Sequence, residues 1–207
     1  HNNTGIALNG QGKLEEAILA YKKAISIKPD FAEAYTNMGS ALKEQGKLDE
    51  AIEAHDKAIS IKPDFSEAHN NMGIALNGQG KPEEAIEAYN KALAIKPDFP
   101  EAHNNMGNVF NQKGETDKAM EAFKNALFIK SDCAETYTNM GVTLHYQGKL
   151  EEAIEAYNKA IAIKPDFVDA WFNGADALEK WNKLDDLEIW LEKAFSSYEV
   201  VPADLRF

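Results

Sequence analysis

The chain contains 207 residues, with 34 acidic and 22 basic side chains and a formal net charge of -12 at pH 7. No cluster of Lys and Arg interrupts the negative charge, so binding to nucleic acid or to an anionic membrane is disfavoured. No apolar run approaches the ~20 residues that a membrane-spanning helix needs. The single cysteine, Cys133, excludes an intrachain disulfide and a thiolate metal cluster, and we expect a reducing, cytoplasmic location.

A repeat with a period of 34 residues organises the chain. The tetrapeptide Lys-Pro-Asp-Phe stands at 28–31, 62–65, 96–99 and 164–167, and a degenerate copy, Lys-Ser-Asp-Cys, stands at 130–133. A fixed period of this size is typical of helical repeat arrays, in which each repeat buries its apolar face against its neighbours. It predicts one array over 1–199, with repeats at 1–30 (truncated), 31–64, 65–98, 99–132, 133–166 and 167–199 (a divergent capping repeat). Residues 200–207 are expected to be a tail or the start of a following element.

Each repeat contains two helical patterns, which we call the first and the second helix. In the first repeat, Leu14, Ala17, Ile18 and Tyr21 fall on one face of a second helix. The first helices are expected to start after the tetrapeptide, with its aspartate as N-cap and an acidic residue three positions later, as in a capping box. Left-handed residues are expected to end the first helices at Gly12, Gly46, Gly80, Gly114, Gly148 and Asn182.

These positions resemble the signature of the tetratricopeptide repeat. In the repeat that begins near Phe31, the signature positions hold Tyr35, Met38, Gly39, Leu42, Ala51, His55, Ala58 and Pro63. The match continues in register through nearly the whole chain. The resemblance implies an all-α fold, a right-handed α-solenoid of helix-turn-helix repeats whose first helices line a concave groove.

One asparagine recurs on the expected groove face of every first helix, as Asn3, Asn37, Asn71, Asn105, Asn139 and Asn173. Asparagine is a mediocre helix former, so helix propensity does not explain it. A side-chain amide can pair with the C=O and N–H of a peptide backbone. Helix layers lie ~8–10 Å apart and an extended chain advances ~3.3 Å per residue, so one asparagine per repeat can contact every third residue.

This arrangement resembles the asparagine ladder in the tetratricopeptide array of O-linked N-acetylglucosamine transferases, where such residues clamp extended protein substrates. Two other interpretations stay open. The asparagines can hydrogen-bond between neighbouring first helices, or they can be inherited from duplication of the repeat.

Ligand specificity is expected to come from groove positions that vary between repeats, namely Ile74, Asn108, Val142, His145 and Tyr146. Acidic residues at the groove border, such as Glu33 and Glu67, favour a neutral or basic peptide. They differ from the lysines and arginines with which some tetratricopeptide modules bind C-terminal carboxylates.

Catalytic, metal and cofactor sites are not expected. The histidines His55, His69 and His103 occupy positions that hold tyrosine in other repeats, which indicates core packing. No Ser/His/Asp set, pair of differentiated carboxylates or phosphate-binding glycine loop is present. Cys133 stands where other repeats have phenylalanine, so it is interpreted as a small core residue.

The last repeat contains all the tryptophans. Trp190 replaces an alanine of the other repeats, and Trp181 replaces a glutamine. We expect this repeat to cap the array, or Trp181, Ile189 and Trp190 to dock on the segment after Glu199 or on a following domain.

Three functions therefore compete. The first is an interaction scaffold that binds an extended peptide or protein segment in its groove. The second is an N-terminal substrate-recognition arm of a larger transferase, a glycosyltransferase or a sulfotransferase-like protein, which the resemblance suggests. The third is self-association through the exposed ends of the array.

Overall fold

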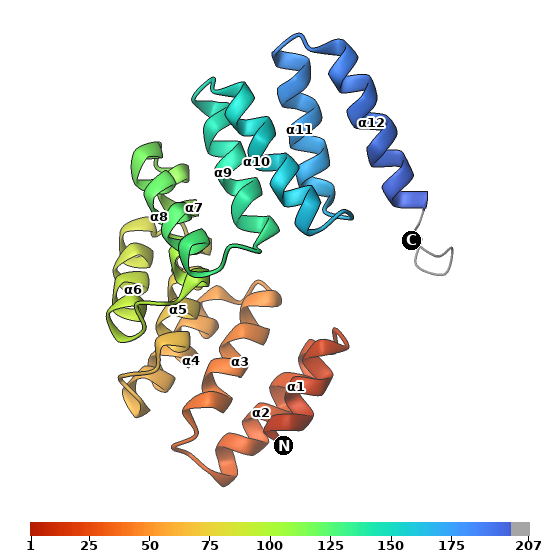
Figure 1. Cartoon of the computed structure of the whole chain (residues 1–207). Coiled ribbons are helices and arrows are strands. Elements are labelled where there is room, and N and C mark those ends of the chain that lie inside the picture. Colours follow the sequence, from red (N-terminus) through yellow and green to blue (C-terminus); the bar gives the residue numbers. More distant parts are fainter. Residues whose placement is uncertain (200–207) are drawn as a thin grey trace. The chain divides into compact units, whose positions relative to one another are not determined.

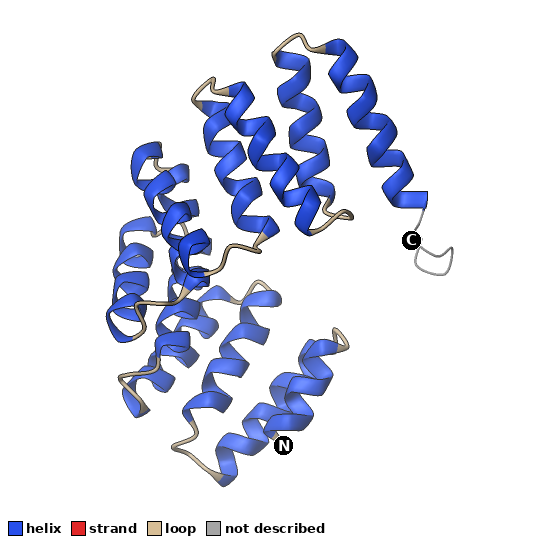
Figure 2. Cartoon of the chain, viewed as in Figure 1, coloured by secondary structure: helices blue, strands red, loops and turns tan. Residues whose placement is uncertain are grey.

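The computed structural model describes residues 1–199, with the side chains of 1–196, and the expected tail at 200–207 lies outside the described residues. The described residues form twelve α-helices and no strand, joined by short loops (Figure 2). The helices are α1 (Asn2–Gly10), α2 (Leu14–Ile27), α3 (Ala32–Glu44), α4 (Leu48–Ile61), α5 (Ser66–Gly78), α6 (Pro82–Ile95), α7 (Pro100–Gln112), α8 (Thr116–Ile129), α9 (Ala134–Tyr146), α10 (Leu150–Ile163), α11 (Val168–Lys180) and α12 (Leu184–Glu199). Among them, no helix has the length and apolarity needed to cross a membrane.

The described residues divide into two compact parts, an N-terminal part of residues 1–109 and a C-terminal part that begins at residue 110. In the N-terminal part, α3 packs on α4 and α5 on α6, while α2 packs on α3 and α4 on α5 (Figure 1). The first helices α1, α3 and α5 also contact one another in succession. In the C-terminal part, α9 packs on α10, α10 on α11, and α9 on α11. Within each part, successive helices therefore pack as stacked helix pairs, which confirms the all-α repeat fold.

Contact between a glycine and an aromatic ring sets how closely the two helices of a repeat approach. A Cβ built on Gly73 lies 2.6 Å from the ring of Tyr89, and one built on Gly39 lies 2.6 Å from the ring of His55. Alanines fill the rest of the interface, and Ala51, Ala85 and Ala153 are fully buried. The prediction that His55 packs as tyrosine does in other repeats is confirmed.

The turns between the two helices have the predicted left-handed residues. The five turn glycines have φ between 73° and 76°, and Asn182 has a φ of 58°. Around Gly46, the Gly46 N–H donates to the Lys43 carbonyl and the Lys47 N–H to the Leu42 carbonyl, each at 2.9 Å. These bonds satisfy carbonyls that the end of a helix leaves without intrahelical partners.

The predicted N-caps are wrong by one residue. Helices α3, α5 and α11 have Phe31, Phe65 and Phe167 as N-cap residues, and no side chain makes a capping hydrogen bond. The preceding aspartates lie outside the helix. The rings of the N-cap residues Phe65 and Phe167 pack against buried alanine clusters. The N-cap carbonyl starts the helix by accepting backbone bonds, as Phe31 does from Ala34 at 3.0 Å.

The last repeat pairs its helices differently. Leu191 stands at the position of Tyr157 in the sequence and is 40% exposed. Trp190, one position earlier, packs against Gly174 instead, and a Cβ built on Gly174 would meet its ring. The Trp190 indole N–H donates to the Trp171 carbonyl at 2.9 Å, and the two rings pack edge to face with centroids 5.1 Å apart.

Candidate functional site

Asparagines of the predicted ladder lie on the first helices of the N-terminal part. Asn3 is exposed, and Asn37, Asn71 and Asn105 are half-buried. Each half-buried amide donates to the preceding first helix: Asn37 Nδ2 to Asn2 Oδ1 at 3.3 Å, Asn71 Nδ2 to Ser40 Oγ at 3.3 Å, and Asn105 Nδ2 to Asn70 Oδ1 at 3.1 Å. The asparagines therefore link neighbouring first helices, which was one of the open interpretations.

The same position in the C-terminal part carries Asn139 and Asn173, both half-buried. The Asn173 amide donates to the Asp169 carbonyl of its own helix at 2.8 Å. This side chain differs from those of the N-terminal part, because its amide bonds to a carbonyl of its own helix and not to a neighbouring helix.

Variable positions of the predicted groove are only partly at the surface. Ile74 packs against the buried cluster around Tyr89, and Val142 packs against the cluster around Tyr157. Asn108 is half-buried, whereas Tyr146 is 82% exposed at the end of α9. Of this set, Tyr146 therefore offers a ligand the largest free apolar surface.

His145 of α9 lies beside a charged pair of α11, Asp176 and Lys180. Its Nε2 is 3.7 Å from Asp176 Oδ2, and Lys180 Nζ is 3.0 Å from the same oxygen. Burial lowers the pKa of His145, the Lys180 charge lowers it further, and Asp176 opposes both effects. The histidine is therefore mainly neutral at pH 7, and it adds little positive charge to this surface.

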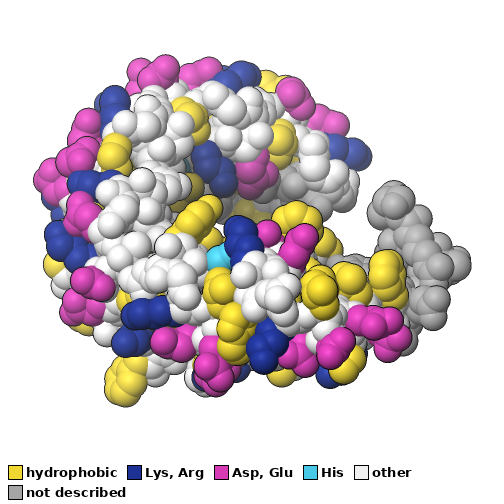
Figure 3. Space-filling view, turned by 90° about the horizontal axis from the view of Figure 1, so that it is seen from above, with side chains coloured by type: hydrophobic (Ala, Val, Ile, Leu, Met, Phe, Trp, Pro, Cys, Tyr) yellow, Lys and Arg dark blue, Asp and Glu magenta, His cyan; other side chains and the backbone are white. Residues whose placement is uncertain are grey.

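The acidic residues at the border of the first helices, Glu33, Glu67, Glu101 and Glu135, are exposed. On the face shown in Figure 3, acidic and basic side chains are interspersed, with no continuous basic patch. Within the described residues, no group of three or more His, Cys, Asp or Glu side chains could hold a metal ion.

The candidate docking residues of the last repeat separate in the structure. Trp190 is only 6% exposed and belongs to the core, so its assignment to a docking surface is wrong. Trp181 is half-buried at the end of α11, with Lys183 Nζ 5.0 Å from its ring centroid. Ile189 is 50% exposed. The sequence showed that Trp190 is too large for an alanine position, but the structure accommodates it by changing which residue of α12 faces Gly174.

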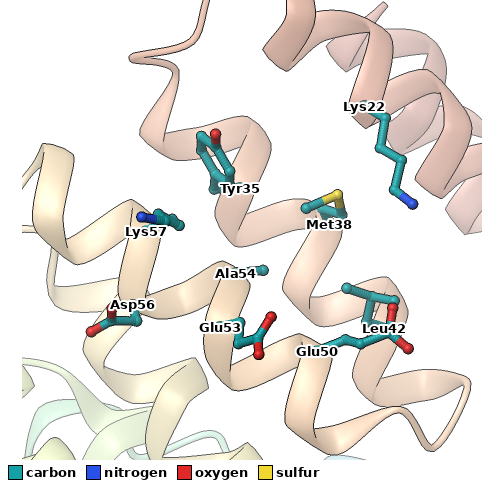
Figure 4. A pocket seen from close by; sticks show the side chains of 9 residues that line it. All are labelled: Lys22, Tyr35, Met38, Leu42, Glu50, Glu53, Ala54, Asp56 and Lys57. Atoms are coloured by element: carbon teal, nitrogen blue, oxygen red, sulfur yellow. The ribbon is translucent and has the colours of Figure 1, made fainter.

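A pocket that was not predicted from the sequence lies between second helices. It has a volume of about 320 Å³, and Tyr35, Met38 and Leu42 of α3 form its floor. Lys22 on α2 and Glu53 on α4 stand at its rim (Figure 4). A similar pocket of about 240 Å³ lies one repeat further on, with His69 in the place of Tyr35. The 34-residue spacing of the lining residues is visible in the sequence, but whether their side chains leave a space depends on how the neighbouring helices pack.

A third pocket, of about 660 Å³, lies in the C-terminal part at the degenerate tetrapeptide. Cys133, Ala134, Ile163 and Phe167 line it, together with Asn139 of the predicted ladder. The half-buried Cys133 accepts a hydrogen bond on Sγ from the Thr136 hydroxyl at 3.1 Å. The lone thiol therefore faces both its own helix and a cavity.

Stacked helix pairs with a repeated left-handed turn define a helical-repeat protein, a class that presents extended binding surfaces. The chain belongs to the TPR repeat family, whose model matches residues 5–46, 39–80, 75–114, 107–148 and 141–180. A comparison with curated proteins finds no match.

Solved structures show the same fold. The MamA protein is 26% identical, with a TM-score of 0.70 over 85% of this chain and 97% of that one. YrrB, described as a TPR protein with an unusual peptide-binding site, is 26% identical, with a TM-score of 0.61 over 82% of this chain and 87% of that one. PilW, a type IV pilus biogenesis factor, is 19% identical, with a TM-score of 0.85 over 97% of this chain and 93% of that one. At this identity, the likeness shows the fold alone. Together, the family and these likenesses support a scaffold for protein–protein interaction.

Proposed function

We propose that the chain binds an extended peptide or protein segment along its first helices, and that the recurring asparagines contact the backbone of this ligand. The observation that carries the proposal is that Asn37, Asn71 and Asn105 stay partly exposed while each is oriented by one bond to the neighbouring helix. A side-chain amide has two N–H donors and a carbonyl oxygen with two lone pairs. One inter-helix bond therefore orients the amide without exhausting it.

Strength and selectivity follow from this type of contact. A net hydrogen bond contributes roughly 0.5–1.5 kcal/mol, so several asparagines support an interaction of about micromolar affinity. Backbone contacts do not distinguish side chains, so binding is broad in sequence. The exposed Glu33, Glu67 and Glu101 favour a neutral or basic peptide over an acidic one. The peptide-binding site named for YrrB, at 26% identity, supports the same class of ligand.

The test uses a fluorescein-labelled peptide, (Gly-Ser-Lys-Ala)3, and fluorescence anisotropy. The triple variant Asn71→Ala, Asn105→Ala, Asn139→Ala is expected to weaken binding at least tenfold while its helical circular dichroism is kept. The matched control replaces Asn90, Asn125 and Asn158, three exposed asparagines of second helices, with alanine. This control is expected to bind with unchanged affinity. An acidic peptide, (Gly-Ser-Glu-Ala)3, binds more weakly. Affinity that survives in the triple variant contradicts the asparagine contacts.

A second candidate function is self-association through the last repeat. Phe172 on α11 is 74% exposed and Phe195 on α12 is 68% exposed. In the preceding repeat, where α11 packs on α9, the residue equivalent to Phe172 is Thr138, and it is 4% exposed. Exposed apolar side chains at a position that is otherwise covered favour association with a second copy of this chain.

Light scattering across a concentration series tests this association. We expect the mass to rise with concentration, and we expect the double variant Phe172→Asp, Phe195→Asp to stay monomeric. A monomer mass that is constant for the original chain at all concentrations overturns self-association.

A further inference from the structure

In the intact copies of the tetrapeptide, the lysine lies over the ring of the phenylalanine. The distance from Nζ to the ring centroid is 5.1 Å for Lys28 and Phe31, 4.7 Å for Lys62 and Phe65, 4.6 Å for Lys96 and Phe99, and 5.3 Å for Lys164 and Phe167. These are cation–π contacts, in which the ammonium group is attracted to the face of the ring. The tetrapeptide is therefore a place where a lysine and an aromatic ring meet.

The copy at 130–133 keeps the lysine but lacks the ring. Cys133 is the N-cap residue of α9, the position that Phe167 holds for α11. A thiol is much smaller than a phenyl group, and the pocket of about 660 Å³ is found at this position, with Lys130 and Cys133 both in its lining. The Thr136 hydroxyl holds the Cys133 sulfur at 3.1 Å.

We propose that this pocket binds an aromatic side chain of the peptide ligand, which supplies the ring that the repeat lacks. Ala134, Ile163 and Phe167 provide apolar contacts for the ring, and Lys130 provides a cation for its face. The carboxylates Asp132, Glu135 and Asp169 also line the pocket and disfavour an acidic side chain. Lys164 lies over Phe167, so it already has an aromatic partner.

The inference rests on the proposed function in one respect, because it names a side chain of the same peptide. Asn139 lines the pocket, so a peptide whose backbone contacts Asn139 can place a neighbouring side chain against Cys133. An extended strand directs successive side chains to opposite faces, so one aromatic residue next to the contacted position is sufficient.

Cys133 provides a direct readout, because it is the single cysteine of the chain. The test measures the rate at which the intact protein reacts with 5,5′-dithiobis(2-nitrobenzoic acid). Acetyl-Gly-Phe-Gly-amide is expected to slow the reaction at least threefold in a saturable manner, and acetyl-Gly-Leu-Gly-amide by less than twofold. Lys130→Met is expected to reduce the protection by the phenylalanine peptide. Equal protection by the two peptides, or none by either, overturns the inference.

The variant Cys133→Phe supplies the ring from the chain itself. It is expected to raise the melting temperature and to abolish binding of acetyl-Gly-Phe-Gly-amide, followed by nuclear magnetic resonance shifts of the peptide. Cys133→Ser keeps the pocket and is expected to keep the binding. Binding that persists in Cys133→Phe contradicts the site.

The peptide (Gly-Ser-Lys-Ala)3 has no aromatic residue, so its binding tests the asparagine contacts alone. If it binds while the phenylalanine peptide gives no protection, the pocket inference fails by itself. If protection occurs while (Gly-Ser-Lys-Ala)3 does not bind, the proposed function fails and the aromatic site stands.

Discussion

Lys62 lies over the face of Phe65, with its Nζ 4.7 Å from the ring centroid. Phe65 is at the same time the N-cap residue of α5 and packs beside the buried Ala58 and Ala68. The tetrapeptide therefore has three structural roles: it ends one repeat, it provides the N-cap of the next helix, and its lysine forms a cation–π contact with its phenylalanine. This explains why the lysine and the phenylalanine recur with a fixed spacing.

Separate replacement of Phe65 and Lys62 is expected to show that the ring contributes more to the free energy of unfolding than the ammonium group does. Phe65→Ala should lower the free energy of unfolding by about 2 kcal/mol, less than the ~3–5 kcal/mol for a fully buried phenylalanine, because Phe65 is half-buried. Lys62→Met should cost at most about 1 kcal/mol. Urea unfolding measures both, and Lys23→Met, at an exposed lysine, is the control. A larger loss in Lys62→Met than in Phe65→Ala would reverse this ranking.

Gly73→Ala is expected to destabilise the second complete repeat by about 1–3 kcal/mol, because a Cβ would lie 2.6 Å from the Tyr89 ring in a closely packed interface. Thermal unfolding followed by circular dichroism measures the loss. Gly10→Ala is the matched control, since a Cβ there meets no atom within 4 Å. If both variants unfold at the same temperature as the original chain, the ring does not limit the helix approach.

Acid is expected to destabilise the repeat that contains His55. Burial, together with the charge of Lys43, lowers the pKa of His55 from 6.5 to about 4. Between these values the unfolded chain binds a proton that the folded chain excludes, so stability is complete above pH 6.5 and falls as the pH drops toward 4. The free energy of unfolding falls by about 3 kcal/mol over this pH range.

The control for this pH dependence is His55→Tyr, because three other repeats have a tyrosine at the equivalent position, namely Tyr21, Tyr89 and Tyr157. The measurement is urea unfolding at pH 7 and pH 4.5 for both proteins. Carboxylates titrate in both, so the difference between the two proteins isolates the histidine. An identical acid response in the two proteins would show that His55 is not the cause.

Gly46→Ala is expected to cost about 1–2 kcal/mol, because the residue has a φ of 76° and a left-handed conformation strains any residue with a Cβ. Asn182→Gly, at the equivalent turn with a φ of 58°, should leave stability equal or slightly higher. Chemical unfolding compares the two. A stabilising effect of Gly46→Ala would contradict the role of the turn.

Trp190→Ala is expected to destabilise the C-terminal part by about 3–5 kcal/mol, because the ring is buried between Gly174 and Trp171. Trp181→Ala removes a half-buried ring and should cost less. Unfolding followed by the fluorescence of the remaining tryptophans measures both losses. A neutral Trp190→Ala would show that this ring contributes little to the packing of the last repeat.

Much of the fold is readable from the sequence because its determinants are local. The period of 34 residues, the turn glycines and the alanine faces each act within one helix pair, and they predicted the helix pairs, the left-handed turns and the packing role of His55. The N-caps were predicted wrongly because the capping-box pattern is also local, whereas Phe65 takes the N-cap position through contacts with two repeats.

The candidate site depended more on tertiary structure. The sequence determined that an asparagine stands at one position of every first helix, since counting along the repeat is enough to establish this. Only the packed array decided that Asn37 and Asn105 bond to a neighbouring helix, that Trp190 replaces its neighbour Leu191 in the core, and that a pocket opens beside Cys133. The physical reason is that these features depend on the distance and rotation between stacked helices, which side-chain volumes on both sides of an interface set together.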